Sequence, residues 1–139
     1  MVAPRSKPYH LLIADDDEGF REILRLILEP FLRLVEAASG EEAIDIVHEQ
    51  QIDIVLLDMH MDVLTGLETL EIVKSIDAIV PCILVTADAT EQLVREAVEA
   101  DAYSVLAKPV RKAELMETVS TALETAYSDP DALYWSADS

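Results

Sequence analysis

Five short apolar runs alternate with five stretches of helical periodicity along this 139-residue chain. The apolar runs are mostly continuous, which is typical of parallel strands that are covered on both faces. We expect strands at 10–14, 34–37, 52–57, 82–86 and 103–107. We expect helices at 18–32, 41–50, 67–75, 91–100 and 112–127. Five consecutive strand–helix units predict an α/β fold with a doubly wound, mostly parallel sheet.

Residues at the helix ends support this division of the chain. Asp17 stands directly before the first predicted helix, and Thr90 stands before the fourth, where each can act as an N-cap. Ser39 followed by Glu42 has the spacing of a capping box. Asp101 follows the fourth predicted helix, and aspartate tolerates the left-handed conformation in which helices often end.

Polar residues stand where four of the predicted strands end. They are Asp15, Asp16 and Asp17 after the first strand, Asp58 after the third, Thr86 at the end of the fourth, and Lys108 after the fifth. In a doubly wound sheet these strand ends converge on one crevice. Carboxylates gathered there repel one another unless a cation shares the space, and hard oxygen ligands suit Mg²⁺. A remaining carboxylate can attack phosphorus, while a hydroxyl and an ammonium group can bind phosphoryl oxygens.

Composition excludes several classes of partner and location. The net charge is −18, from 28 acidic and 10 basic residues, which argues against binding to nucleic acid or an anionic membrane. The single cysteine, Cys82, lies in an apolar run and is expected to be a core residue. No apolar run approaches the about 18 residues of a membrane span, and residues 1–8 do not resemble a signal peptide. We therefore expect a soluble, cytoplasmic protein.

The chain resembles the receiver domains of two-component response regulators, including the single-domain regulators of chemotaxis. The matching elements are Ile13-Ala14-Asp15-Asp16-Asp17, Asp58-Met59-His60-Met61 with Gly66, Thr86-Ala87, and Lys108-Pro109. The resemblance implies a flavodoxin-like (βα)5 fold with strand order 2-1-3-4-5 and a receiver domain over residues 9–127. Residues 1–8 would form an N-terminal tail.

Residues 128–139 are expected to form an acidic C-terminal tail or linker. Pro130 interrupts helical periodicity there, and the segment carries Tyr134 and Trp135. We interpret the segment as a frayed end or linker. The alternative is an aromatic anchor that docks on the domain or on a partner.

The resemblance also implies roles for the residues at the strand ends. Asp58 would accept a phosphoryl group from a phosphohistidine and form an aspartyl phosphate. Asp16, Asp58 and the backbone carbonyl of His60 would coordinate Mg²⁺ or Mn²⁺, and Asp15 would act through a bound water. Thr86 and Lys108 would contact the phosphoryl oxygens. The chemistry is limited to accepting phosphate and hydrolysing it, so we do not expect an enzyme with an external product.

Several positions depart from the family pattern or modulate it. Asp62 stands where receivers usually carry proline. Val105 stands where an aromatic switch residue usually lies, and Tyr103, on the same face of a regular strand, is a candidate substitute. His60 and Asp88 occupy positions that tune hydrolysis of the acyl phosphate in the family.

The expected partners are a histidine kinase or phosphotransfer protein and an effector of unknown identity. A homodimer through the fourth and fifth helices is also possible, whereas nucleic acid and membrane are not expected. One alternative is a phosphatase of the haloacid-dehalogenase type built on Asp15 and Asp17, which would leave Asp58 without a role. Another is a pseudo-receiver that binds partners without being phosphorylated.

Overall fold

Parallel strands form the centre of the fold, as the continuous apolar runs predict. In the computed structural model, which describes residues 7–135, the strands are β1 (His10–Ala14), β2 (Arg33–Ala37), β3 (Ile54–Asp58), β4 (Cys82–Thr86) and β5 (Ser104–Ala107). They form one five-stranded sheet in the order β2-β1-β3-β4-β5, and all four neighbouring pairs are parallel. The predicted doubly wound, flavodoxin-like sheet is confirmed.

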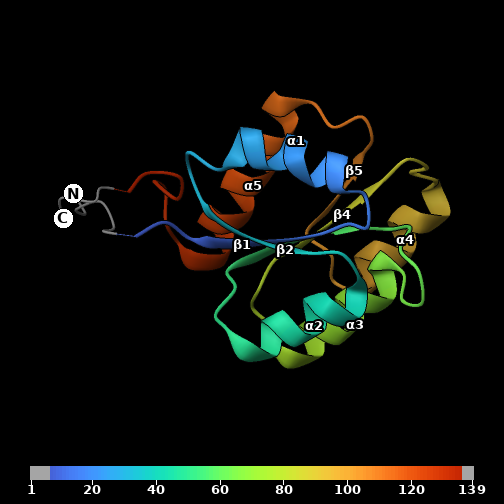
Figure 1. The fold of residues 1–139 in the computed structure, drawn as a ribbon. Helices are drawn as coiled ribbons and strands as arrows, with labels where there is room; N and C mark the ends of the chain where they lie inside the picture. The colour runs from blue at the N-terminus through green and yellow to red at the C-terminus, as the bar shows by residue number, and fades with distance from the viewer. Residues whose placement is uncertain (1–6, 136–139) are drawn as a thin grey trace.

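Helices cover both faces of this sheet (Figure 1). They are α1 (Glu18–Leu28), α2 (Gly40–Glu49), α3 (Gly66–Ile76), α4 (Glu91–Glu99) and α5 (Lys112–Tyr127). Figure 1 shows α1 and α5 on one face, and α2, α3 and α4 on the other. Because strand side chains alternate between the faces, each strand supplies apolar residues to two separate cores.

The helix caps follow the sequence closely. The Asp17 carboxylate accepts hydrogen bonds from the N–H groups of Gly19 and Phe20, and the Thr90 hydroxyl caps α4 as predicted. Ser39 caps α2, but the Glu42 carboxylate accepts from the N–H of Ala38, so the predicted capping box is only half formed. A complete capping box stands at the start of α3 instead.

Several predicted boundaries differ from the structure, most of them by one residue. The first helix ends at Leu28, since Pro30 lacks an N–H donor and its ring would clash with the preceding turn. The third strand begins at Ile54, where its pairing with Leu11 of β1 starts, and the Asp53 carboxylate just before it accepts a hydrogen bond from the N–H of His10 at 2.7 Å. The fifth strand begins at Ser104, one residue after Tyr103.

The described part of the C-terminal segment packs against the domain. The Tyr127 ring stacks on Tyr9 with centroids 5.3 Å apart, and the Tyr9 hydroxyl donates to Asp129 at 2.8 Å. Ala132 is 1% exposed within the core that α1 and α5 cover. The described part of this segment therefore packs on the domain through Asp129 and Ala132. The side chains of Tyr134 and Trp135 are 71% and 38% exposed, so the structure does not show the two aromatic residues as the anchor. Residues 1–6 and 136–139 of the two predicted tails lie outside the described residues.

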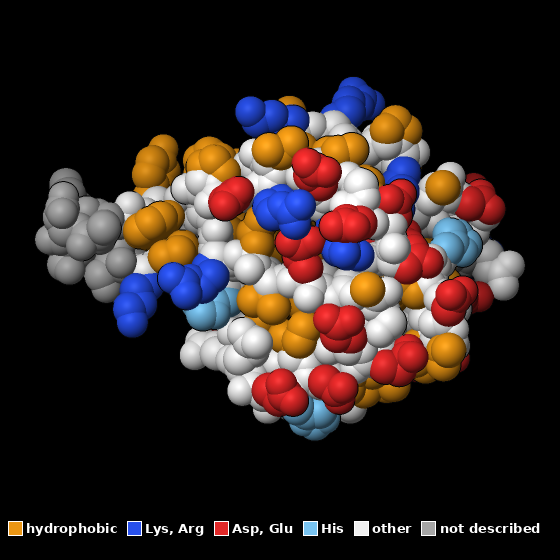
Figure 2. All heavy atoms as spheres, viewed as in Figure 1, with side chains coloured by type: hydrophobic (Ala, Val, Ile, Leu, Met, Phe, Trp, Pro, Cys, Tyr) orange, Lys and Arg blue, Asp and Glu red, His pale blue; other side chains and the backbone are white. Residues whose placement is uncertain are grey.

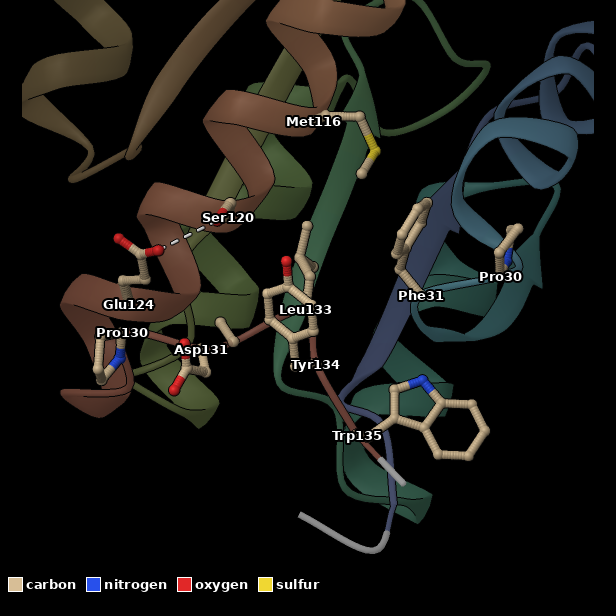
Figure 3. A pocket seen from close by; sticks show the side chains of 11 residues that line it. Pro30, Phe31, Met116, Ser120, Glu124, Pro130, Asp131, Leu133, Tyr134 and Trp135 are labelled. Atoms are coloured by element: carbon tan, nitrogen blue, oxygen red, sulfur yellow. Dashed lines mark hydrogen bonds between the residues drawn. The ribbon is translucent and has the colours of Figure 1, made fainter. Parts of the chain in front are cut away.

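An open groove of about 590 Å³ runs beside this docked segment (Figure 3). Its lining residues are Pro30, Phe31, Met116, Ser120, Glu124, Pro130, Asp131, Ala132, Leu133, Tyr134 and Trp135. Pro30 and Phe31 lie between the end of α1 and Arg33, the first residue of β2. The groove therefore lies at the edge of the sheet where the strands begin, which is the amino edge. It is thus remote from the acidic strand ends at the carboxyl edge.

The surface carries the acidic excess of the sequence. Figure 2 shows many more Asp and Glu side chains than Lys and Arg side chains on the visible face. In residues 7–135 no helix is long and apolar enough to cross a membrane.

Candidate functional site

Three carboxylates meet at the carboxyl edge of the sheet. Asp15 directly follows β1, and Asp58 ends β3, the strand that pairs with β1. Asp15 and Asp58 are buried and Asp16 is exposed. One oxygen from each of the three lies within 4.8 Å of the others. This is the arrangement that the sequence predicts, and three hard oxygen donors around one point suit a divalent cation such as Mg²⁺.

Lys108 brings the opposite charge to these carboxylates. Its Nζ lies 3.1 Å from Asp15 Oδ2 and 3.1 Å from Asp58 Oδ1. The backbone N–H of Lys108 donates to the Thr86 carbonyl at 2.8 Å, which fixes the chain where it leaves β5. Burial opposes the charged ammonium, but the hydrogen bonds to Asp58 and Asp15 outweigh it and raise the pKa of Lys108. The ammonium is therefore a fixed positive charge beside both buried acids.

Asp15 is the most constrained of the acids. Burial raises the pKa of the Asp15 carboxyl, and the nearby charge of Asp58 raises it further. The hydrogen bond from the Asp17 N–H, at 2.8 Å, and the Lys108 ammonium act in the opposite direction but do not cancel the rise. A carboxyl whose pKa is raised in the fold resists ionisation there, so Lys108 alone does not fully offset the cost of burying the Asp15 charge. A bound cation would favour the ionised form.

Arg21 is a site residue that the sequence reasoning missed. Its Nη1 donates to the Asp15 backbone carbonyl at 2.6 Å, and its Nε donates to Glu36 at 3.0 Å. Arg25 also pairs with Glu36, so α1 and β2 together hold the loop that carries Asp15 and Asp16. An arginine one turn into the helix after the acidic loop was the available signal.

Thr86 lies at the end of β4 and is fully buried. Its hydroxyl oxygen accepts a hydrogen bond from the backbone N–H of Asp88 at 3.1 Å and lies 3.5 Å from His60 Nε2. The His60 ring therefore points toward Thr86. Within residues 7–135 the one group of potential metal ligands consists of the three acids, and the His60 imidazole is not part of it.

The loop after Asp58 is tightly built. The N–H of Gly66 donates to the Met59 carbonyl at 2.9 Å, which closes the loop on itself. Asp62 is exposed, and Val63 adopts a φ of 62°, a left-handed conformation that β-branched residues rarely hold. Asp101 also has a positive φ of 68°, as its position after α4 predicts.

The structure argues against Tyr103 as a substitute for the aromatic switch residue. Val105 is half-buried and pairs with Leu84. The N–H of Tyr103 donates to Cys82, four residues before Thr86 along β4, which is roughly 13 Å at the usual rise of a strand. Tyr103 is two residues from Val105 and so shares its face of the sheet, but it lies beside the end of β5 that is remote from Thr86. Its side chain therefore does not reach Thr86.

Cys82 takes no part in this site. It lies at the start of β4, fully buried, and burial raises the pKa of its thiol to about 12. The predicted core role of Cys82 is confirmed.

Comparisons with known proteins agree on one family. The family model for the response regulator receiver domain matches residues 11–120. The chain is 33% identical over 114 residues to the chemotaxis protein CheY of Halobacterium salinarum, and the alignment covers 81% of this chain and 95% of that protein. It is 32% identical over 120 residues to the transcriptional regulatory protein GlrR of Escherichia coli, covering 85% of this chain.

The longer relatives extend well beyond the matched region. The chain spans 27% of the length of GlrR and 17% of the length of the sensory/regulatory protein RpfC of Xanthomonas campestris. The match of this chain to these proteins is a match to one part of them.

Solved structures share the fold. A putative response regulator from Chloroflexus aurantiacus is 31% identical, with a TM-score of 0.80, and covers 84% of this chain and 98% of that one. A CheY-like receiver domain from Methanospirillum hungatei superposes with a TM-score of 0.84 at 24% identity and covers 88% of this chain and 98% of that one. These findings leave no support for the haloacid-dehalogenase alternative. The chain belongs to the response regulator receiver domain family.

Proposed function

We propose that this chain is a phosphorylation-controlled switch that accepts a phosphoryl group on Asp58. The donor would be a phosphohistidine of a histidine kinase or phosphotransfer protein. The observation that carries the proposal is the position of Asp58 at the end of β3, with two further carboxylates and the Lys108 ammonium around it. A nucleophile, a metal-ligand set and a cation for the phosphoryl oxygens meet at one point.

The chemistry follows from these groups. One Asp58 oxygen attacks phosphorus, the nitrogen–phosphorus bond of the donor breaks, and the imidazole leaves with the electron pair. Lys108, now paired with both acids, would move its ammonium to a phosphoryl oxygen. The Thr86 hydroxyl would donate to another oxygen, exchanging its contact with His60 for this one.

A divalent cation fits the acidic cluster. Asp16, Asp58 and the backbone carbonyl of His60 would hold Mg²⁺ or Mn²⁺, with Asp15 acting through a water. Three carboxylate oxygens within 4.8 Å, and the raised pKa of buried Asp15, support such a site. When bound, the ion would neutralise charge that develops on the phosphoryl oxygens. The protein would act only on its own phosphate, without an external product.

The output would be a changed surface on α4, β5 and α5. Val94, Val98 and Tyr103 are exposed apolar side chains on α4 and beside β5. Such side chains suit a protein partner, either an effector or a second copy that pairs through α4 and α5. With Val105 in place of an aromatic ring, Thr86 would influence this surface through the backbone of its own loop.

A small phosphodonor tests the proposal without knowledge of the kinase. Acetyl phosphate with Mg²⁺ should label the wild-type chain, and a chelator should reduce labelling to background, because the carboxylates would then repel the incoming phosphate. Absence of labelling with Mg²⁺ present would favour the pseudo-receiver alternative.

His60 and Asp88 are expected to set the lifetime of the phosphorylated state. The His60 ring lies 3.5 Å from the Thr86 hydroxyl and would limit access of water to the acceptor, so His60→Ala should accelerate loss of phosphate on the order of threefold to tenfold, a barrier change of about 1 kcal/mol. Asp88→Ala should act more weakly, because its contact with Thr86 is made by the backbone N–H. Dephosphorylation after removal of the donor measures both rates, with Glu91→Ala, at an exposed position of α4, as the control. Identical rates in all three variants would exclude the role.

A further inference from the structure

The Lys108 ammonium has a third neighbour besides its two carboxylates. Its Nζ lies 4.1 Å from the centre of the Phe20 ring, over the ring face. The electron-rich face of an aromatic ring attracts a cation at this distance. The ammonium is therefore held on three sides, by Asp15, by Asp58 and by Phe20.

Phe20 is itself held firmly in place. It lies in the first turn of α1, where its N–H donates to the Asp17 capping carboxylate at 3.3 Å. Its ring is half-buried and packs against the core that α1 and α5 cover. The helix cap and the core together fix the ring under the ammonium.

We propose that Phe20 is a positioning residue for Lys108, and that its ring keeps the ammonium in the crevice when the carboxylates take other partners. This inference rests on the proposed function, in which Asp15 and Asp58 bind a cation and Asp58 also binds phosphorus. Both of the acids that now hold Lys108 are then engaged elsewhere. The ring face is the contact of the three that neither the cation nor the phosphoryl group uses.

A ring contact suits this task better than another acid. A third carboxylate would add negative charge where phosphate must enter, whereas a phenyl ring attracts the ammonium without a net charge. The side chain of Lys108 is 23% exposed, so without the ring the ammonium could turn toward water. The predicted effect is a fall in the rate of phosphoryl transfer while the fold is retained.

The sequence permits a test that changes the ring's charge distribution and leaves its shape nearly unchanged. Phe20 and Phe31 are the two phenylalanines of the chain, and Phe31 lies at the opposite edge of the sheet. In a Phe31→Leu background, biosynthetic incorporation of mono-, di- and trifluorophenylalanine changes residue 20 alone. Fluorine withdraws electrons from the ring face, so the attraction should weaken stepwise.

Two readouts are measured on each protein. The first is the rate of labelling by acetyl phosphate with Mg²⁺, which should fall steadily, by about two- to fivefold over the series, as expected for a partly exposed cation–π contact. The second is the NMR shift of the Lys108 ε-methylene protons in metal-free protein, which the ring current should displace upfield. Phe20→Leu should abolish the upfield displacement and slow labelling by acetyl phosphate. Phe20→Tyr should keep the upfield displacement and the wild-type rate of labelling.

A purely structural role for Phe20 gives a different pattern. The rate would then be flat across the fluorine series, since packing is nearly unchanged, and this result would overturn the inference. An unshifted Lys108 signal in the wild-type chain would also overturn it. In a Phe20→Leu background the fluorinated residue is incorporated at Phe31 alone, and the rate of phosphorylation should then not change across the fluorine series. If the wild-type chain takes no label at all, the proposed function itself fails, and the positioning role falls with it.

Discussion

Replacing Asp58 by asparagine should reduce phosphoryl transfer to this chain at least about a thousandfold, to background, because an amide lacks the anionic oxygen that attacks phosphorus. The fold should survive the change. Asparagine has nearly the same shape, and removing the Asp58 charge relieves its repulsion of buried Asp15. Labelling by acetyl phosphate, together with thermal unfolding, separates loss of the nucleophile from loss of the structure.

Asp62→Asn is the matched control for this variant. Asp62 is an exposed acid four residues further along the same loop, so the same substitution there should leave labelling within about twofold of wild type. Full labelling of Asp58→Asn would show that another residue accepts the phosphate.

Replacing Gly66 by alanine should destabilise the chain by about 3 kcal/mol and also impair the site. A Cβ at residue 66 would collide with the Asp58 carbonyl oxygen and would lie 2.9 Å from Met59 Cα. Both obstacles are backbone atoms, so no side chain can turn aside to make room. The strand end that carries the acceptor must shift, and we expect a lower unfolding temperature together with slower labelling.

Gly19→Ala provides the comparison for this effect. Gly19 also lies in the first turn of a helix, but a Cβ there would meet the Asp17 Oδ1 atom at 3.2 Å, a side-chain contact that can relax. Its free energy of unfolding should change by less than about 1 kcal/mol, since alanine also favours the helix. Equal destabilisation by the two variants would mean that the close approach at Gly66 is not the cause.

Most of the fold and the members of the acidic site follow from local sequence. The strands are continuous apolar runs because helices cover both faces, and this pattern alone predicts that Asp15, Asp58, Thr86 and Lys108 lie at one edge of the sheet. The N-cap at Asp17 follows from the same reading, because a short acid before an amphipathic helix has a local partner in the first turn.

What the sequence did not predict depends on contacts between distant segments. The packing of Ala132 in the core and the Phe20 ring beneath Lys108 both join segments that lie far apart in the sequence. The Arg21 bond to the Asp15 carbonyl is local by comparison, and the early arginine of the first helix was its signal. The error at Tyr103 has a related origin. Strand alternation gave the correct face, but only the register with β4 shows that the residue lies too far from Thr86.

The most direct test of the account is to map the phosphoryl group after reaction with acetyl phosphate and Mg²⁺. Reduction with borohydride cleaves an aspartyl phosphate and leaves homoserine at the modified position, which peptide mass spectrometry then identifies. We predict homoserine at residue 58 and unmodified aspartate at residues 15 and 16. Homoserine at residue 15 with Asp58 intact, or no modified residue in fully folded protein, would contradict the assignment of Asp58 as the phosphoacceptor.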